Sequence, residues 1–344
     1  MAKILIIRFS AIGDVAMTVP VLYSWAMQHP ENEAVVLSRP SLAPLFSRLP
    51  DNVSFYSADL KGKHQGFRGL YTLFKELRML NFDAVLDLHN VLRTKFLSLL
   101  FRLSGINVYT MAKGRWEKRK LTRRKNKILV NQKNSFQRYA NVFEQAGFPV
   151  LLNFTSIYGH EKGDISQIGN VTGEKGNLKW VGIAPFSKHR GKTYPLELQE
   201  QVVAHFAKES NVKVFLFGGG KEEEDCFKKW TDKYPEVVSL IGKLTMNTEL
   251  ALMSHLDVML SMDSANMHMA SLVNIPVVSI WGATHPYAGF MGWKQLPTNT
   301  VQMSDLACRP CSVFGQKPCF RGDYACLYRI KPERVIDKIE SIIL

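Results

Sequence analysis

The chain has 344 residues, which is long enough for two domains that each bury their own core. Apolar residues make up 46% and charged residues 22%, as in ordinary globular proteins. The apolar runs at 4–7 and 96–101 are far shorter than a bilayer span, and the first is too short for a signal-peptide core, so we expect a cytoplasmic protein.

The chain carries 44 basic and 30 acidic residues, a net charge of +14, and the excess is concentrated in one stretch. This basic segment, "KGRWEKRKLTRRKNK" (113–127), contains nine bases and one acid. Such a run is either a solvated surface or a site for a polyanion: nucleic acid, anionic lipid headgroups or a phosphorylated glycan. Trp116 is its single aromatic residue, so the interleaved bases and aromatic rings of a single-strand binder are missing, and we expect no nucleic-acid partner.

The first half of the chain alternates strand-like and helix-like patterns. Apolar runs indicate strands at 3–9, 34–38, 53–56 and 84–88. Because helical patterns lie between them, we predict a parallel sheet covered on both faces. Pro20 belongs in the first turn of a helix, so regular helix after the first strand is expected to begin near Thr18.

The turn after the first strand, "RFSAIGDVAMTVP" (8–20), contains Gly13 and Asp14. A turn from a buried strand to a helix commonly binds phosphate, because free helical N–H groups point outward there. A carboxylate would repel a phosphate. Asp14 is therefore either a helix cap or a group that does chemistry beside a ligand held elsewhere.

After a polar, glycine-rich stretch at 150–178 that we interpret as a linker, the alternation resumes. Further strands are indicated at 180–185, 212–220, 237–242, 256–263 and 276–282. The sequence thus predicts an α/β protein of two Rossmann-like halves, with a ligand site in a cleft that faces the carboxyl ends of both sheets.

Two turns of the second half carry groups suited to an anionic ligand. Asp263 and Ser264 lie in the turn between a predicted strand and a predicted helix, and His268 follows one helical turn after Ser264. "APFSKHRGKTYPLE" (184–197) supplies hydroxyl and cationic donors from Ser187, Lys188, Arg190 and Lys192. The competing interpretation of the first turn is a helix cap followed by a half-buried histidine. The competing interpretation of the second is a loop whose lysines face solvent. "FGGGKEEED" (217–225) lacks both the dinucleotide fingerprint and the Walker lysine.

Taken together and in order, "FSAIGDVAMTVP", "DAVLDLHNVLRT", "GKTYP", "FGGGKEEE" and "SMDSANMHMASLVNIPVVSIWGATHP" resemble glycosyltransferase family 9, the ADP-heptose:lipopolysaccharide heptosyltransferases. The resemblance implies a GT-B fold, two Rossmann-like domains with the active site between them. It also implies inverting transfer, without metal or cofactor, from ADP-heptose to the lipopolysaccharide inner core. Such an acceptor would bring the protein to the cytoplasmic face of the inner membrane.

The resemblance also suggests roles and boundaries. Asp14 matches the general base, and Lys192, which we count as catalytic, matches a lysine at the donor diphosphate. The expected donor set is Ser187, Lys188, Glu222, Asp263, Ser264, Ala265 and His268, and the expected acceptor set is Gly13, Arg93, Arg119 and Arg123. We expect an acceptor domain at 1–160, a linker at 161–178, a nucleotide-sugar domain at 179–330 and a terminal helix at 331–344. Where the family has Asp-Thr-Gly this chain has Asp263-Ser264-Ala265, which leaves the donor's identity open.

Three alternatives belong to other classes. A nucleotide-sugar epimerase of the same two-domain shape would work without an acceptor. A nucleic-acid-binding protein would act through the basic segment. An NAD-dependent oxidoreductase is disfavoured because "FSAIGD" lacks the dinucleotide fingerprint.

The tail contains Cys308, Cys311, Cys319 and Cys326 in C-x2-C-x7-C-x6-C spacing. Such a set could hold a structural zinc ion. Because the intervals are shorter than in common zinc ribbons, we favour reduced thiols that pack a compact loop against the second domain.

Overall fold

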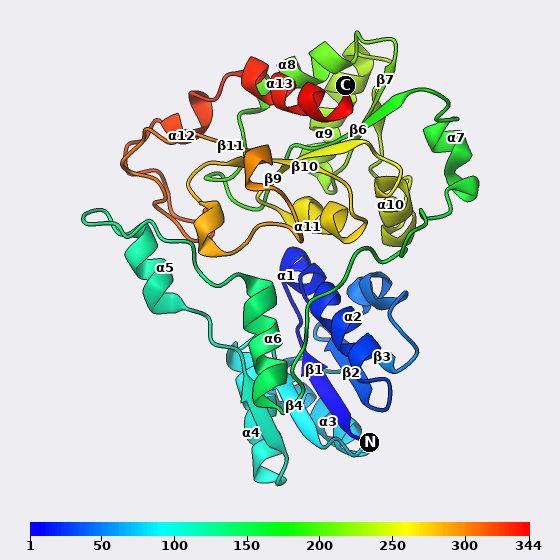
Figure 1. The fold of residues 1–344 in the computed structure, drawn as a ribbon, viewed down its shortest axis with the longest axis vertical. Helices are drawn as coiled ribbons and strands as arrows, with labels where there is room; N and C mark the ends of the chain where they lie inside the picture. The colour runs from blue at the N-terminus through cyan, green and yellow to red at the C-terminus, as the bar shows by residue number, and fades with distance from the viewer. The chain divides into compact units, whose positions relative to one another are not determined.

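The computed structural model describes residues 1–344 and divides into two compact units (Figure 1). Unit 1 comprises Met1–Gly114 and Lys133–Ile157, and unit 2 comprises Arg115–Gln132 and Tyr158–Leu344. Each unit contains its own sheet, in which every strand pair is parallel. The predicted α/β class with two parallel sheets is confirmed.

Unit 1 holds a five-stranded sheet in the order β3-β2-β1-β4-β5. The strands are β1 Lys3–Ile7, β2 Glu33–Ser38, β3 Val53–Ser57, β4 Ala84–Asp87 and β5 Asn107–Thr110. Four of them were predicted, whereas the short edge strand β5 has no apolar run that would indicate it. The strand order reverses between β1 and β4, and in such sheets ligands bind at the carboxyl ends of the strands on either side of the reversal.

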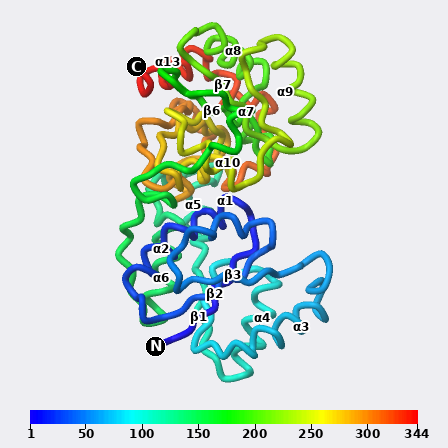
Figure 2. The backbone as a smooth tube through the Cα atoms, turned by 90° about the vertical axis from the view of Figure 1, so that its right-hand side faces the viewer, coloured from blue at the N-terminus to red at the C-terminus, as the bar shows by residue number.

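Helices cover both faces of the unit 1 sheet (Figure 2). They are α1 Ile12–Ala16, α2 Val19–Gln28, α3 Gly66–Arg78, α4 Leu92–Leu103 and α6 Ser135–Gln145, with a 3₁₀ segment at Pro40–Phe46. Leu5 and Ile7 of β1 pack with α3 and α4 in one core cluster, while on the other side Trp25 of α2 meets Phe143 of α6. The start of regular helix near Thr18 is confirmed, since Thr18 is the N-cap residue of α2, but the preceding short helix α1 was not predicted.

Unit 2 holds a six-stranded sheet in the order β11-β10-β9-β6-β7-β8. The strands are β6 Lys179–Ala184, β7 Val212–Leu216, β8 Val238–Ser239, β9 Val258–Met262, β10 Val277–Trp281 and β11 Thr300–Gln302. All but β11 were predicted. Here the order reverses between β6 and β9, so the ends of these two strands form the expected ligand-binding edge.

Helices of unit 2 lie on both sides of its sheet, but the helix at Arg115–Thr122 lies apart from the sheet (Figure 1). They are α5 Arg115–Thr122, α7 Gly169–Thr172, α8 Leu196–Phe206, α9 Lys221–Lys233, α10 Met246–Met253, α11 Ala265–Leu272, α12 Ala325–Tyr328 and α13 Pro332–Ile343, with 3₁₀ segments at Ser166–Ile168, Pro286–Ala288 and Pro297–Asn299. Apolar side chains of α8, α9 and α13 form one buried cluster with the strands. No helix is long and apolar enough to cross a membrane.

The division into units differs from the boundaries expected at 1–160, because residues 115–132, which we call the strap, group with unit 2. Lys127 Nζ donates to the carbonyl oxygens of Ala307, at 3.0 Å, and Cys308. The backbone N–H of Gln132 donates to the carbonyl oxygen of Tyr287 at 3.1 Å. These bonds hold most of the basic segment on unit 2, whereas we had expected it on the half that carries Asp14.

The stretch expected as a linker at 161–178 is also fastened to unit 2. The backbone N–H of Gly163 donates to Ser254 Oγ at 2.8 Å, and Lys175 forms an ion pair with Asp257 at 2.8 Å. The second segment of unit 2 accordingly begins at Tyr158 and includes the whole of the expected linker.

Candidate active site

The first part of the site lies at the end of β1, where the chain turns into α1. Asp14 occupies the first turn of α1, and its Oδ2 accepts from the backbone N–H of Ala11 at 3.2 Å. The same oxygen pairs with Arg8 Nη2 at 3.0 Å, and the Asp14 side chain remains 33% exposed. Asp14 thus accepts a hydrogen bond at the start of α1 and also keeps a third of its side chain exposed to solvent.

Arg8 is the residue that fixes this carboxylate, and the sequence analysis missed it. Its side chain is only 7% exposed, and Nη1 donates to the carbonyl oxygen of Leu88. Burial acts to lower the pKa of the guanidinium, but the neighbouring Tyr139, Asp14 and Asp87 outweigh it and the pKa is raised. The Tyr139 hydroxyl donates to the carbonyl oxygen of Asp14 at 3.2 Å. Arg8 is therefore a permanent, immobile cation beside Asp14.

The adjacent strand β4 contributes Asp87 and His89. Asp87 Oδ1 accepts from the backbone N–H groups of His89 at 2.9 Å and Asn90 at 2.8 Å, which shapes the turn. His89 Nε2 lies 3.4 Å from Ser10 Oγ. Burial, then the charges of Arg8 and Lys113, lower the pKa of His89 to about 3. His89 is therefore neutral at physiological pH and can only hydrogen-bond.

The residues expected to meet the acceptor lie in different units. Gly13 is buried beside Asp14 in α1, and Arg93 is exposed in the first turn of α4, where its charge also lowers the pKa of His89. Arg119 and Arg123 are exposed as well, but they belong to the strap of unit 2. Gly13 and Arg93 are thus the acceptor candidates that share a unit with Asp14.

The second part of the site joins the ends of β6 and β9 in unit 2. Lys192 Nζ and Asp263 Oδ2 form an ion pair at 3.1 Å, with side chains that are 16% and 5% exposed. Ser187 Oγ donates to the carbonyl oxygen of His189 at 3.1 Å and lies 3.1 Å from Thr193 Oγ1, which stabilises the loop that carries Lys192. The two turns singled out from the sequence are therefore in direct contact.

Helix α11 begins beside this ion pair. Ser264 is its N-cap residue, but the hydroxyl does not cap the helix and lies instead 3.1 Å from Ser261 Oγ. Ala265 is the first helical residue, and His268 is buried one turn later. The start of α11 therefore offers backbone N–H groups next to a cationic Lys192, an arrangement that suits a diphosphate.

No hydrogen bond or ion pair in the structure joins two of the expected donor residues to this cluster. Lys188 and Glu222 are both exposed. In the first turn of α9, Glu223 rather than Glu222 binds the glycine-rich turn, since its Oε2 accepts from the backbone N–H of Gly219 at 2.8 Å. Burial raises the pKa of Glu223, although that hydrogen bond opposes the shift.

The cysteine-bearing tail packs beside the loop that carries Lys192. Gly315 has φ +77°, and a Cβ there would collide with Cγ of Lys192. Cys308, Cys311, Cys319 and Cys326 line one small hollow and form no disulfide, and no three His, Cys, Asp or Glu side chains are arranged to hold a metal ion. Cys326 belongs to the buried core, and burial above all raises the pKa of its thiol to about 12. The tail is a packed element that supports Lys192.

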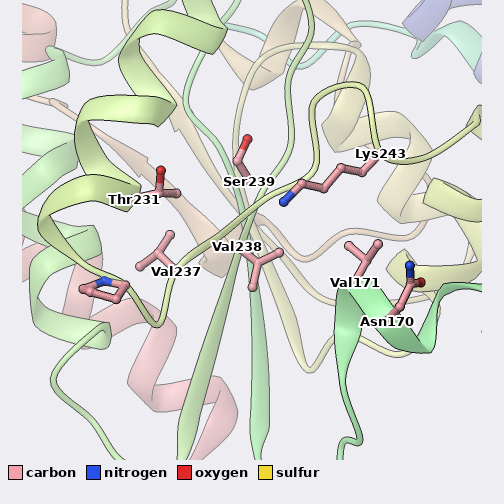
Figure 3. A pocket seen from close by; sticks show the side chains of 8 residues that line it. Asn170, Val171, Thr231, Val237, Val238, Ser239 and Lys243 are labelled. Carbon is pink, nitrogen blue, oxygen red and sulfur yellow. The ribbon is translucent and has the colours of Figure 1, made fainter.

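A separate hollow of 640 Å³ lies at the edge strand β8 (Figure 3). It is lined by Asn170, Val171, Thr231, Pro235, Val237, Val238, Ser239 and Lys243. It contains none of the residues expected in the active site.

Solved structures share the fold of this chain. A family 9 glycosyltransferase from Veillonella parvula superposes with a TM-score of 0.74 at 18% identity, covering 99% of this chain and 97% of its own. ADP-heptose LPS heptosyltransferase II from E. coli gives a TM-score of 0.71 at 17% identity, covering 99% and 98%. The chain therefore has the GT-B fold of these enzymes.

The sequence identifies the family. Residues 70–317 match the model of glycosyltransferase family 9 (heptosyltransferase). Lipooligosaccharide heptosyltransferase 2 of Campylobacter jejuni is 24% identical over 338 residues, with 96% of each chain covered. The chain belongs to glycosyltransferase family 9 and is a glycosyltransferase, which confirms the resemblance described above.

Proposed function

We propose that the protein transfers a heptose from an ADP-heptose donor to the core of lipopolysaccharide, with inversion at the anomeric carbon. The observation that carries the proposal is the carboxylate of Asp14, held by Arg8 and still one-third exposed. The choice of sugar and acceptor rests on family membership and on the names of the similar proteins, which include a lipooligosaccharide heptosyltransferase and an ADP-heptose LPS heptosyltransferase.

Unit 2 supplies the donor site in this proposal. Lys192 and the N–H groups at the start of α11 bind the diphosphate, and Asp263 keeps the Lys192 ammonium in place before the donor arrives. The hydroxyls of Ser187 and Ser264 and the ring of His268 border the same ligand. As the bond from the anomeric carbon to the phosphate oxygen breaks, the ADP leaving group gains negative charge. Lys192 and the helix N–H groups stabilise that charge.

Unit 1 supplies the base. The acceptor hydroxyl attacks the anomeric carbon as that carbon develops oxocarbenium character, and its proton passes to Asp14. Arg8 positions the carboxylate for this transfer, while neutral His89 and the exposed Arg93 hydrogen-bond the acceptor sugar. The new bond joins the acceptor oxygen to the anomeric carbon, and ADP departs.

Titration of ADP-, UDP-, GDP- and CDP-sugars, followed by calorimetry and thermal shift, tests the donor assignment without an acceptor, because a ligand that binds only the folded state raises its stability. We expect ADP-heptose to bind tightest. Tighter binding of a UDP- or GDP-sugar would overturn the heptose assignment. Release of an epimerised sugar in the absence of acceptor would favour the epimerase alternative.

A further inference from the structure

The strap of unit 2 exposes an unusual set of apolar side chains. Trp116, Ile128, Leu129 and Val130 are between 41% and 64% exposed. Three of them are consecutive, so they form one continuous apolar strip at the end of the strap. Scattered apolar residues are normal on a protein surface, but a continuous exposed strip marks an interaction site.

Exposed basic side chains precede this strip in the strap. Arg115, Arg119, Arg123, Arg124 and Lys125 are exposed, and Glu117 is the single acid between Arg115 and Gln132. No ion pair in the structure neutralises these five bases. The strap therefore combines apolar side chains with uncompensated positive charge.

Contacts with the rest of unit 2 hold the strap in one orientation. Lys118 and Leu121 are buried, and Lys118 Nζ lies 4.2 Å from the centroid of the Phe290 ring. Arg124 lies over Phe320 at 4.6 Å, and Phe320 is itself half exposed. Figure 1 shows α5 and the chain that follows it beside the loop that contains Phe320. The exposed strip thus belongs to a folded surface that Phe320 extends.

We propose that this surface docks the protein on an anionic lipid bilayer. Bases attract the phosphate headgroups, while tryptophan and aliphatic side chains enter the boundary between headgroups and acyl chains. A glycan or a nucleic acid would use the bases but would leave Ile128, Leu129 and Val130 in water. The combination of charge and aliphatic side chains therefore favours lipid.

This inference does not rest on the proposed function, because docking requires neither donor nor acceptor. The test uses the whole protein and sedimentation with vesicles of phosphatidylethanolamine and phosphatidylglycerol, free of lipopolysaccharide. We expect binding at low salt that weakens as salt screens the charges, and little binding to vesicles of phosphatidylcholine alone. Equal binding to both vesicle types, or to neither, would overturn the proposal.

Two sets of variants locate the surface. Ile128→Ser, Leu129→Ser and Val130→Ser together, and Arg124→Gln with Lys125→Gln, should each reduce vesicle binding at least about tenfold. The matched controls are Leu99→Ser with Leu103→Ser, two exposed leucines of α4, and Lys228→Gln with Lys229→Gln, two exposed lysines of α9. A loss of binding in the controls as large as in the strap variants would contradict the assignment.

Tryptophan fluorescence gives a second readout. Brominated phosphatidylglycerol should quench part of the emission of the wild-type protein and much less of that of Trp116→Phe, because Trp116 is the tryptophan that enters the lipid. Equal quenching in both proteins would contradict the docking geometry. If single-stranded RNA displaces the protein from vesicles and binds the aliphatic variant as tightly as the wild type, the strap is a nucleic-acid site instead.

Discussion

Lys192 illustrates how side chains from two separate turns come into contact, since its ammonium pairs with Asp263. Its ammonium is mostly buried against Asp263, so the pair has little freedom to move when a ligand binds. A charge-assisted hydrogen bond from this ammonium to a phosphate oxygen of the proposed donor would contribute about 1.5–3 kcal/mol, equivalent to roughly a 10- to 150-fold change in affinity. The proposed role of Lys192 is therefore large enough to measure directly.

We expect Lys192→Ala to weaken ADP-heptose binding by about tenfold or more and to lower turnover as well, because the ammonium meets the diphosphate in both ground and transition states. Calorimetry of donor binding checks this. Lys188→Ala is the matched control, since Lys188 is an exposed lysine of the same loop, and should have a much smaller effect. Donor affinity that is unchanged in Lys192→Ala would remove Lys192 from the donor site.

The sequence indicated those candidate site residues that lie in recognisable turns, but not those that depend on contacts between distant strands. Asp14, Asp263 and Lys192 follow strand ends directly or lie in short glycine-containing turns, so the pattern indicates them. Arg8 and His89 are buried polar residues whose importance depends on β1 and β4 being neighbours in the sheet. Pairing of strands about eighty residues apart cannot be derived from local periodicity alone.

At the scale of elements, the cysteine-bearing tail supports the loop that carries Lys192. Gly315 adopts a left-handed conformation and packs against the Lys192 side chain, so only glycine fits both constraints. The loop is held in turn by Ser312 Oγ, which accepts from the backbone N–H of Gly315 at 2.9 Å.

We predict that Gly315→Ala displaces Lys192 and weakens donor binding several-fold, even though residue 315 has no polar group for the ligand. The strain of a left-handed alanine should also cost about 1–2 kcal/mol of unfolding free energy. Gly322→Ala is the control, because Gly322 also has positive φ in the tail but has open space around it. If both variants lower stability equally and neither changes donor affinity, the supporting role is refuted.

The strap contains two of the residues expected to bind the acceptor. Arg119 and Arg123 are exposed and were expected to attract phosphates and acidic sugars of the lipopolysaccharide core. We predict that Arg119→Gln with Arg123→Gln raises the KM for a delipidated core acceptor about two- to tenfold at low salt and less at high salt, with donor affinity unchanged. Steady-state kinetics at two salt concentrations measure this. No change in KM at low salt would show that these arginines do not contact the acceptor.

Most strands were predictable from the sequence, and the exceptions are the short edge strands. Strands such as β1, β4 and β9 are continuous apolar runs because helices cover both of their faces. The edge strands β5 and β11 are three or four residues long and partly exposed, so they carry no such run. Residues 115–132 were assigned to the wrong half because their attachment depends on hydrogen bonds to residues more than 150 positions away.

At the scale of the whole molecule, both units repeat one design. Each contains a parallel sheet whose strand order reverses at its centre, and the candidate site residues of each lie where the reversal occurs. The two units differ in charge chemistry: unit 1 presents a carboxylate supported by an arginine, and unit 2 presents a lysine beside a helix start. One arrangement suits proton removal, and the other suits binding of a leaving diphosphate.

The most direct test of this account compares wild type and Asp14→Asn in two assays: transfer of heptose from ADP-heptose to a lipopolysaccharide core acceptor, and binding of ADP-heptose alone. We predict that wild type forms a product of inverted anomeric configuration. In Asp14→Asn, turnover should fall about 10²- to 10⁴-fold while the Kd for ADP-heptose stays the same, because the carboxylate removes a proton and does not hold the donor. Turnover near the wild-type level, or a loss of donor binding in parallel with turnover, would contradict the account.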